Sequence, residues 1–172
     1  MLAGRTPLAW ANAIVVADPP EKAAPTSDTE AVSPTARELN HRMNEVGREL
    51  VVISPYFIPG PAGLATLEGL RRRGVRVRVL TNSLASTDVP VVHSAYRRYR
   101  EPLLEAGVEI FEVRPAPGQL RSDQESHGGV SGGSGAPFAL HAKAYVFDRQ
   151  SVFLGSANLD PRSLELNTEV GL

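Results

Sequence analysis

The sequence predicts an α/β sandwich in which a mixed, mostly parallel sheet carries helices on both faces. Short apolar segments with β character alternate along the chain with longer segments whose apolar residues recur at helical spacing. Gly74 and Gly107 each follow a helical segment and directly precede a strand-like one, as expected of glycines that end helices. Strands joined through helices pair in parallel and are covered by those helices, which produces the predicted layers.

The first elements follow from local patterns. Residues 10–17 (WANAIVVA) predict a strand, and the polar, Pro- and Ala-rich residues 18–34 predict a linker. Thr35 is the predicted N-cap of a helix, because Glu38 follows three residues later in a capping box. The next predicted elements are a buried strand over 50–54, a helix over 62–73 and an alternating strand over 75–80.

A glycine-rich segment separates two predicted strands in the second half of the chain. Residues 114–137 hold glycines among Ser, Asp and Gln, without the strand before and the helix after that a phosphate-cradling loop requires. We interpret this segment as a flexible loop, with a nucleotide site as the alternative. The flanking elements are a helix over 91–106 kinked at Pro102, a strand over 108–113, a strand over 138–147, a turn at 148–150 and a strand over 151–154.

Composition limits the chemistry that the chain supports. The formal net charge of −1 and the pI of about 6.4 disfavour a nucleic-acid partner, because nonspecific duplex binding usually needs a positive field. With no cysteine, the chain has no disulfide, no thiolate metal site and no cysteine nucleophile. The longest apolar run, residues 8–17, is about half the roughly 20 residues that a membrane-spanning helix needs.

Four polar residues are expected to meet at one edge of the sheet. His141 and Lys143 are two residues apart, so on a strand their side chains point to the same face. Ser156 and Asn158 follow the paired strand with the same parity and offer a hydroxyl and an amide to that space. A neutral histidine can attack phosphorus, while a cation and preorganised donors stabilise charge on phosphoryl oxygens. The pattern therefore predicts a site for a phosphodiester, whereas a packed or solvated residue is the alternative for His141 taken alone.

The motif residues resemble those of a known superfamily. HAKAYVFD at 141–148 and GSAN at 155–158 match the complete HxKxxxxD and GSxN signature of the phospholipase D superfamily. The resemblance implies a phospholipase D-like sandwich with the motif at the interface between two similar halves. It also implies that one motif histidine attacks phosphorus to form a phosphohistidine. The histidine of the other half then protonates the leaving alcohol and later activates the acceptor.

The resemblance implies a role for each polar residue. His141 is one of the two histidines, and Lys143 and Asn158 bind phosphoryl oxygens. Ser156 assists this binding, and Glu169 holds the His141 ring through its second nitrogen. This chemistry requires no metal and no cofactor.

Two further motif residues are expected to support the site structurally. Asp148 stands at odd spacing from His141, so on a straight strand it faces away from the phosphate. We therefore expect Asp148 to brace the hairpin and not to bind the substrate. Gly155, which opens the GSAN segment, is the second supporting residue.

Segments outside the motif resemble bacterial cardiolipin synthases. They are SPYFIPG at 54–60, RGVRVRVLTNSLASTDVPVVH at 73–93, AGVEIFE at 106–112 and GSANLDPRSLELNTEVGL at 155–172. Together these segments resemble the second of the two motif-bearing halves of such enzymes, and residues 10–22 resemble the end of the first half. The chain departs from the two-motif pattern in carrying one HxK motif. The implied division is the tail of a preceding half over 1–18, a linker over 19–35, and a phospholipase D-like domain over 36–172 that is truncated at its C-terminus.

Tyr56, Phe57 and His93 lie in these segments and are candidates for a lipid headgroup pocket. For Tyr56 and Phe57 the alternative is a place in the hydrophobic core. For His93 the alternatives are a core or a surface role. The sequence leaves these possibilities open.

The resemblance implies half of a phosphatidyltransferase that moves a phosphatidyl group from one phospholipid to phosphatidylglycerol and yields cardiolipin. Its partners are these phospholipids, a membrane surface and a second motif-bearing half, supplied by the parent chain or by a homodimer. The implied location is peripheral, at the bacterial cytoplasmic membrane. Two alternatives stay open: a single-motif homodimeric phosphodiesterase or nuclease, and a non-catalytic lobe that binds phosphate or a membrane.

Overall fold

The computed structural model describes residues 10–23, 33–87, 89–114 and 139–172. Apart from Arg114, the predicted glycine-rich loop over 114–137 lies outside the described residues. Within the described ranges, no helix is both long enough and apolar enough to cross a bilayer.

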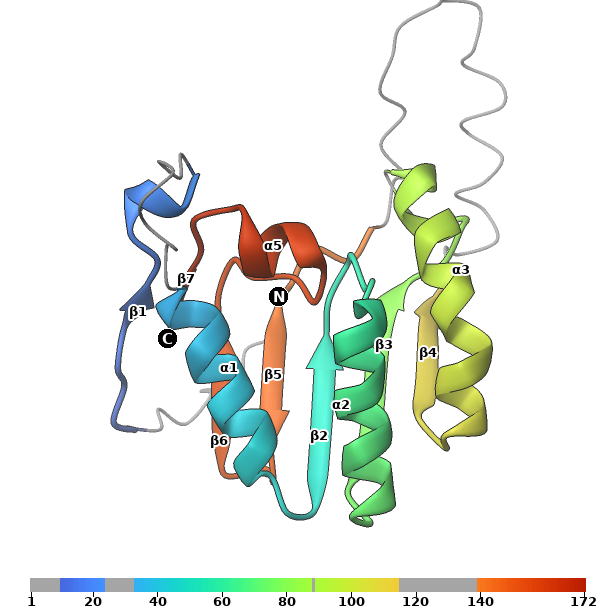
Figure 1. The fold of residues 1–172 in the computed structure, drawn as a ribbon, viewed down its shortest axis with the longest axis horizontal. Coiled ribbons are helices and arrows are strands. Elements are labelled where there is room, and N and C mark those ends of the chain that lie inside the picture. Colours follow the sequence, from blue (N-terminus) through green and yellow to red (C-terminus); the bar gives the residue numbers. More distant parts are fainter. Residues whose placement is uncertain (1–9, 24–32, 88, 115–138) are drawn as a thin grey trace, which may run out of the picture.

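A five-stranded mixed sheet forms the centre of the domain (Figure 1). Its order is β4-β3-β2-β5-β6, with bounds β2 (Glu49–Ile53), β3 (Arg76–Asn82), β4 (Glu109–Val113), β5 (Ala144–Phe147) and β6 (Ser151–Leu154). The pairings of β2 with β3 and of β3 with β4 are parallel. The pairings of β2 with β5 and of β5 with β6 are antiparallel. The predicted α/β class and mixed sheet are confirmed, although the sheet is less parallel than predicted.

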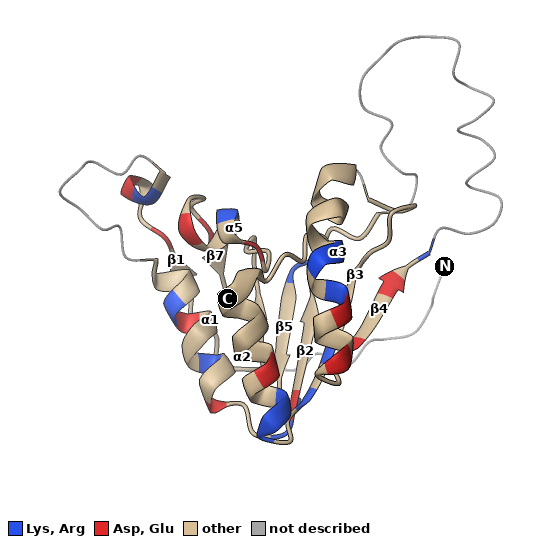
Figure 2. Ribbon diagram, turned by 45° about the vertical axis from the view of Figure 1, so that its right-hand side comes forward, with Lys and Arg blue, Asp and Glu red and all other residues tan. Residues whose placement is uncertain are grey.

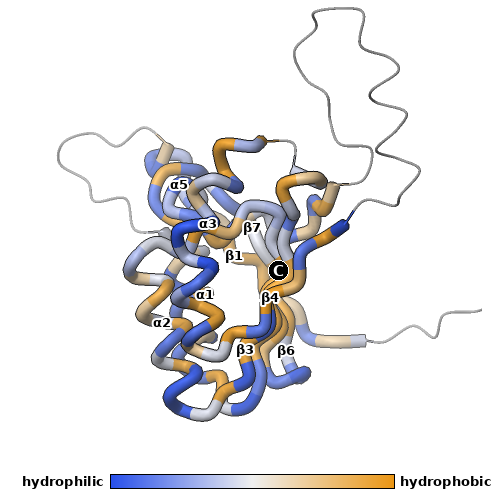
Figure 3. The backbone as a smooth tube through the Cα atoms, turned by 90° about the vertical axis from the view of Figure 1, so that its right-hand side faces the viewer, coloured by the Kyte–Doolittle hydropathy of each residue, from blue (hydrophilic) through white to orange (hydrophobic). Residues whose placement is uncertain are grey.

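Three long helices cover one face of this sheet: α1 (Pro34–Glu45), α2 (Gly60–Arg72) and α3 (Pro90–Glu105). Figure 3 shows them together on one side of the sheet, which is seen edge-on. In the described part of the chain, the prediction of helices on both faces is therefore met on one face only. The opposite face exposes large apolar side chains, including Phe111, Val152 and Leu154.

The alternation of the strands explains why this face is the core. Leu50 and Val52 of β2 and Val77 and Val79 of β3 are all 0% exposed and point toward the helices. The helices contribute apolar residues at helical spacing to the same cluster. Leu39, Met43, Leu67, Leu70, Tyr96 and Leu103 are among these.

Two predicted boundaries need correction. Ser33, and not Thr35, caps α1, because the Ser33 hydroxyl accepts a hydrogen bond from the Ala36 N–H at 3.0 Å. Pro34 then occupies the first helical position, where its missing N–H costs nothing. The predicted strand over 10–17 is reduced to β1 (Val16–Ala17), and Trp10 is 94% exposed. The partner strand β7 (Val170–Gly171) pairs with these two residues only.

The segment before α1 packs against the domain. β1 pairs antiparallel with β7, and the short helix η1 (Pro20–Ala23) carries Lys22, which is 2% exposed. The predicted division into a preceding tail over 1–18 and a linker over 19–35 stays a prediction. Its boundary, however, runs through residues that contact this domain.

Charged side chains form local ion pairs on the helices and at the starts of strands. Figure 2 shows Lys or Arg together with Asp or Glu on each of α1, α2 and α3, and the two signs alternate along α1. At the start of β3, Arg76 pairs with Glu109 at 2.6 Å and Arg78 with Glu49 at 2.7 Å. The other end of the central strands faces the motif, since Ile53 pairs with Ala144, which follows Lys143 directly.

Candidate active site

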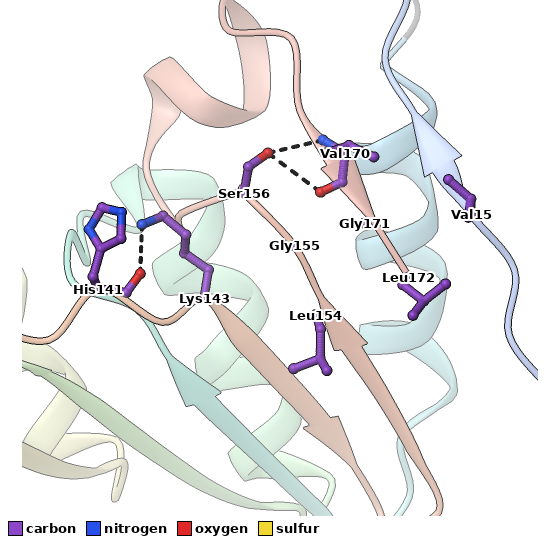
Figure 4. Close-up of a pocket in the computed structure, with 9 residues that line it drawn as sticks. All are labelled: Val15, His141, Lys143, Leu154, Gly155, Ser156, Val170, Gly171 and Leu172. Atoms are coloured by element: carbon purple, nitrogen blue, oxygen red, sulfur yellow. Dashed lines mark hydrogen bonds between the residues drawn. The ribbon is translucent and has the colours of Figure 1, made fainter. Parts of the chain in front are cut away.

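His141, Lys143 and Ser156 line one pocket of about 530 Å³ (Figure 4). The remaining lining residues are Val15, Leu154, Gly155, Val170, Gly171 and Leu172. In the close-up, His141 and Lys143 lie at one end, Leu154, Leu172 and Val15 at the other, and Ser156 between them. The pocket therefore has a polar end beside a predominantly apolar wall.

His141 and Lys143 reach this pocket from an irregular segment and not from a strand. β5 begins at Ala144, so the predicted strand over 138–147 is shorter than expected. β2 ends at Ile53, the partner of Ala144, and provides no ladder beyond it. The two residues still lie together, because the Lys143 ammonium donates to the main-chain oxygen of His141 at 2.9 Å.

Asn82 holds the residue before His141 and was missed in the sequence. Its side-chain amide donates to the Leu140 carbonyl at 3.2 Å, and its side-chain oxygen accepts from the Leu140 N–H at 2.9 Å. These two bonds replace a strand ladder where β2 has ended. Asn82 is 3% exposed, and a polar residue at the carboxyl end of a parallel strand was a usable signal.

Ser156 is fixed between Glu169 and β7. Its hydroxyl donates to the Glu169 carboxyl and accepts from the Val170 N–H at 3.0 Å. Its main-chain N–H donates to the Val170 carbonyl at 2.9 Å. The resemblance had implied that the Glu169 carboxyl holds the His141 ring. Among the described residues, this carboxyl instead accepts its side-chain hydrogen bond from Ser156. Glu169 is 7% exposed.

Asn158 lies deeper than the other motif residues. It is 8% exposed, its side-chain oxygen accepts from the Ser54 hydroxyl at 3.4 Å, and it does not line the pocket. Of the four polar groups expected to converge, the structure brings His141, Lys143 and Ser156 to one pocket. Asn158 is left beside Ser54.

Two of the candidate headgroup residues belong to the core. Phe57 is 1% exposed and His93 is 6% exposed. Both rings make edge contacts with the ring of Tyr96, at centroid distances of 6.1 and 5.4 Å. Tyr56 is half-buried, and none of these three residues lines the pocket that holds His141, Lys143 and Ser156. The core alternative thus accounts for Phe57 and His93.

Asp148 braces the hairpin, as its spacing predicted. Its carboxylate accepts from three successive main-chain N–H groups before β2: Gly47 at 2.9 Å, Arg48 at 2.7 Å and Glu49 at 2.8 Å. The bonds from Gly47 and Glu49 are the main reason that the pKa of Asp148 lies below its ordinary value. Asp148 itself has a positive φ of 55°, in the turn between β5 and β6.

Replacing Asp148 by Asn is expected to cost about 1 to 2 kcal/mol at neutral pH, through the loss of charge-assisted hydrogen bonds. Asn tolerates positive φ, but its NH₂ group replaces one of the two carboxylate oxygens. That NH₂ group then faces either the Gly47 N–H or the N–H groups of Arg48 and Glu49, which are donors like itself. Because the folded-state pKa is depressed, this contribution is present above the unfolded-state pKa of about 4 and is lost as the pH falls through the folded-state value. Urea unfolding from pH 7 to pH 3 should show the two proteins converging, and a constant difference would contradict this assignment.

Comparison with known protein families shows the family to which this chain belongs. The family described as "Cardiolipin synthase, PLD-like domain" matches residues 39–172. The chain belongs to this family. The cardiolipin synthase-family domain is 41% identical over 168 residues to cardiolipin synthase C of Escherichia coli, covering 98% of this chain and 34% of that protein. It is 30% identical over 130 residues to cardiolipin synthase B of E. coli, covering 76% of this chain and 26% of that protein. The chain thus spans about a third of the length of these relatives or less.

Solved structures show the same fold at low sequence identity. The phospholipase D family member Nuc from Salmonella typhimurium superposes with a TM-score of 0.59 at 16% identity, covering 92% of this chain and 78% of that one. Phosphatidylserine synthase from Haemophilus influenzae superposes with a TM-score of 0.60 at 17% identity, covering 83% of this chain and 32% of that one. The phospholipase D-like fold predicted from the motif is confirmed.

Proposed function

We propose that this cardiolipin synthase-family domain is half of a phosphatidyl-transfer site that works through a phosphohistidine at His141. The observation that carries the proposal is the shared pocket of His141, Lys143 and Ser156. An exposed imidazole beside a fixed ammonium suits attack on a phosphodiester, because the cation stabilises the charge that builds on phosphoryl oxygens.

The proposed reaction has two displacements at phosphorus. A neutral ring nitrogen of His141 forms a bond to phosphorus while the bond from phosphorus to the headgroup oxygen breaks. The leaving alcohol takes a proton from the histidine of a second motif-bearing half, in the parent chain or in another copy. That histidine then removes the proton of a phosphatidylglycerol hydroxyl, whose oxygen attacks phosphorus and releases His141.

The apolar wall supports a phospholipid as the substrate. Val15, Leu154, Val170 and Leu172 surround the part of the pocket away from Lys143. A glycerophospholipid has a charged phosphate next to acyl chains, which matches this division, whereas a nucleic acid has no comparable apolar extension. The exposed apolar residues and the phospholipid substrate also support a peripheral place at the bacterial cytoplasmic membrane.

The nucleophilic step is tested with a short-chain phosphatidyl ester of p-nitrophenol. Nitrophenolate leaves without protonation, so the missing second histidine is not needed for the first displacement. The full chain is expected to release a burst of nitrophenolate that approaches one equivalent per chain. Mass spectrometry should then find a phosphatidyl adduct on the peptide that contains His141.

Other outcomes separate the alternatives. Release without an adduct, or an adduct on another residue, would contradict the phosphohistidine. A dimer in solution that cleaves DNA through His141 would favour the nuclease. A folded chain that binds vesicles of phosphatidylglycerol but releases no nitrophenolate would favour the non-catalytic lobe.

A further inference from the structure

A buried ion pair lies outside the pocket. Both of its residues belong to the segment before α1, and both contact the segment before β7. The Lys22 ammonium donates to the Asp18 carboxylate at 2.6 Å, and these side chains are 1% and 0% exposed. Lys22 also donates to the Ser163 carbonyl at 3.0 Å and to the Ser33 hydroxyl at 3.1 Å. Because desolvation offsets most of the attraction in such a pair, stability alone is a weak explanation for its presence.

The remaining bonds of Asp18 show what the pair holds in place. Its carboxylate accepts from the Ser33 hydroxyl and the Thr35 N–H, both at 3.0 Å, and from the Glu169 N–H at 3.2 Å. Burial tends to raise the pKa of Asp18, but the bonds from Lys22, Thr35 and Ser33 outweigh it and keep the pKa below its ordinary value. The Asp18 carboxylate is thus an anion held by four donors: the Lys22 ammonium, the Ser33 hydroxyl and the N–H groups of Thr35 and Glu169.

Glu169 is bound to this segment through both of its main-chain polar groups. Its N–H donates to the Asp18 carboxylate, and its carbonyl accepts from the Asp18 N–H at 2.8 Å and from the Thr35 hydroxyl at 3.3 Å. The pairing of β1 with β7 continues directly after this contact. The position of the Glu169 main chain therefore depends on residues more than 130 positions earlier in the sequence.

We propose that the Asp18–Lys22 pair is a positioning element of the active site, which fixes the main chain of Glu169 and thereby the Ser156 hydroxyl on the pocket wall. The chain of contacts runs from Lys22 through Asp18 to Glu169, whose carboxyl receives the Ser156 hydroxyl. Its effect on the reaction rests on the function proposed above. A displacement of about 1 Å in such a group costs up to roughly 100-fold in rate.

Two variants of the full chain and a matched control test this proposal. Lys22→Met removes the ammonium but leaves the Asp18 carboxylate buried without its cation, so it can lower the stability of the whole domain. The double variant Asp18→Asn with Lys22→Met leaves a neutral pair of similar volume, in which the new amide lacks the charge that holds the Glu169 N–H. Arg72→Met is the control, because it removes a pair of the same i,i+4 spacing in which the Arg72 side chain is 71% exposed and Glu68 is half-buried.

The double variant is expected to keep the wild-type urea midpoint while hydrogen exchange in the peptide 166–172 speeds up at least about tenfold. The nitrophenolate burst should slow roughly 10- to 100-fold with its amplitude unchanged, because His141 is intact. Arg72→Met should change none of these.

Two results would overturn the positioning role: wild-type exchange at 166–172 in the folded double variant, or a rise in exchange that is equal along the whole chain. An unchanged burst rate together with faster exchange would overturn the link to the site. If the wild type shows no burst at all, the proposed function fails, and the exchange comparison still decides whether the pair positions Glu169.

Discussion

Replacing His141 by Ala is expected to slow nitrophenolate release by about 10⁴-fold or more, because removing an enzyme nucleophile leaves only the contribution of binding groups. The imidazole is exposed and its side chain supports no part of the core. The free energy of unfolding should therefore change by less than about 0.5 kcal/mol. Rapid-mixing absorbance measurements give the rate, and urea unfolding monitored in parallel gives the stability.

His41→Ala is the matched control for this prediction. His41 lies on α1, and its side chain is 59% exposed beside Glu45 at 3.4 Å. This variant should release nitrophenolate at the wild-type rate. A burst that survives in the His141 variant, or one that is lost equally in the His41 variant, would remove His141 from the nucleophilic role.

Gly155→Ala is expected to lower stability by about 3 kcal/mol and to distort the pocket at the same time. A Cβ at this position would lie 2.3 Å from the Val170 carbonyl oxygen and 2.9 Å from the Gly171 Cα, both of which are main-chain atoms. Gly155 and Gly171 form an isolated bridge, so neither strand can move without breaking it. Since Ser156 follows directly, the nitrophenolate burst should fall together with the thermal midpoint.

Gly69→Ala offers the control for a glycine without such a neighbour. Gly69 lies inside α2, and its added Cβ would meet only the Arg72 guanidinium at 3.7 Å, an ordinary contact. Alanine in a helix interior should raise stability by about 0.5 kcal/mol or more. Calorimetry on both variants checks the pair, and equal midpoints would show that the close approach at Gly155 has no energetic effect.

The elements that could be predicted are those whose signal is local. The helices around Leu39 and Leu67 and the strand that contains Val77 carry apolar residues at the period of their own element. Gly74 and Gly107 have φ values of 81° and 83°, as expected of residues that end helices. Errors occurred at element ends, where a partner strand or a capping hydrogen bond decides the boundary.

Only the residues of the candidate site that belong to the sequence motif could be predicted. The spacing predicted that His141, Lys143, Ser156 and Asn158 share a space, and the structure brings the first three of them to one pocket. Asn82 and Asp18 belong to no such motif, and the one signal for Asn82 is its place at the carboxyl end of a parallel strand. Their partners, Leu140 and Glu169, are brought to them by the path of the chain.

The sequence by itself determined the family, the order of the main strands and helices from α1 to β6 and the identity of the chemical groups, because each depends on residue type and spacing within a short segment. Tertiary structure alone decided that the Glu169 carboxyl meets Ser156, that Asn158 lies beside Ser54, and that the described helices leave one sheet face open. These outcomes depend on hydrogen bonds and packing between segments far apart in the chain, which no local pattern encodes.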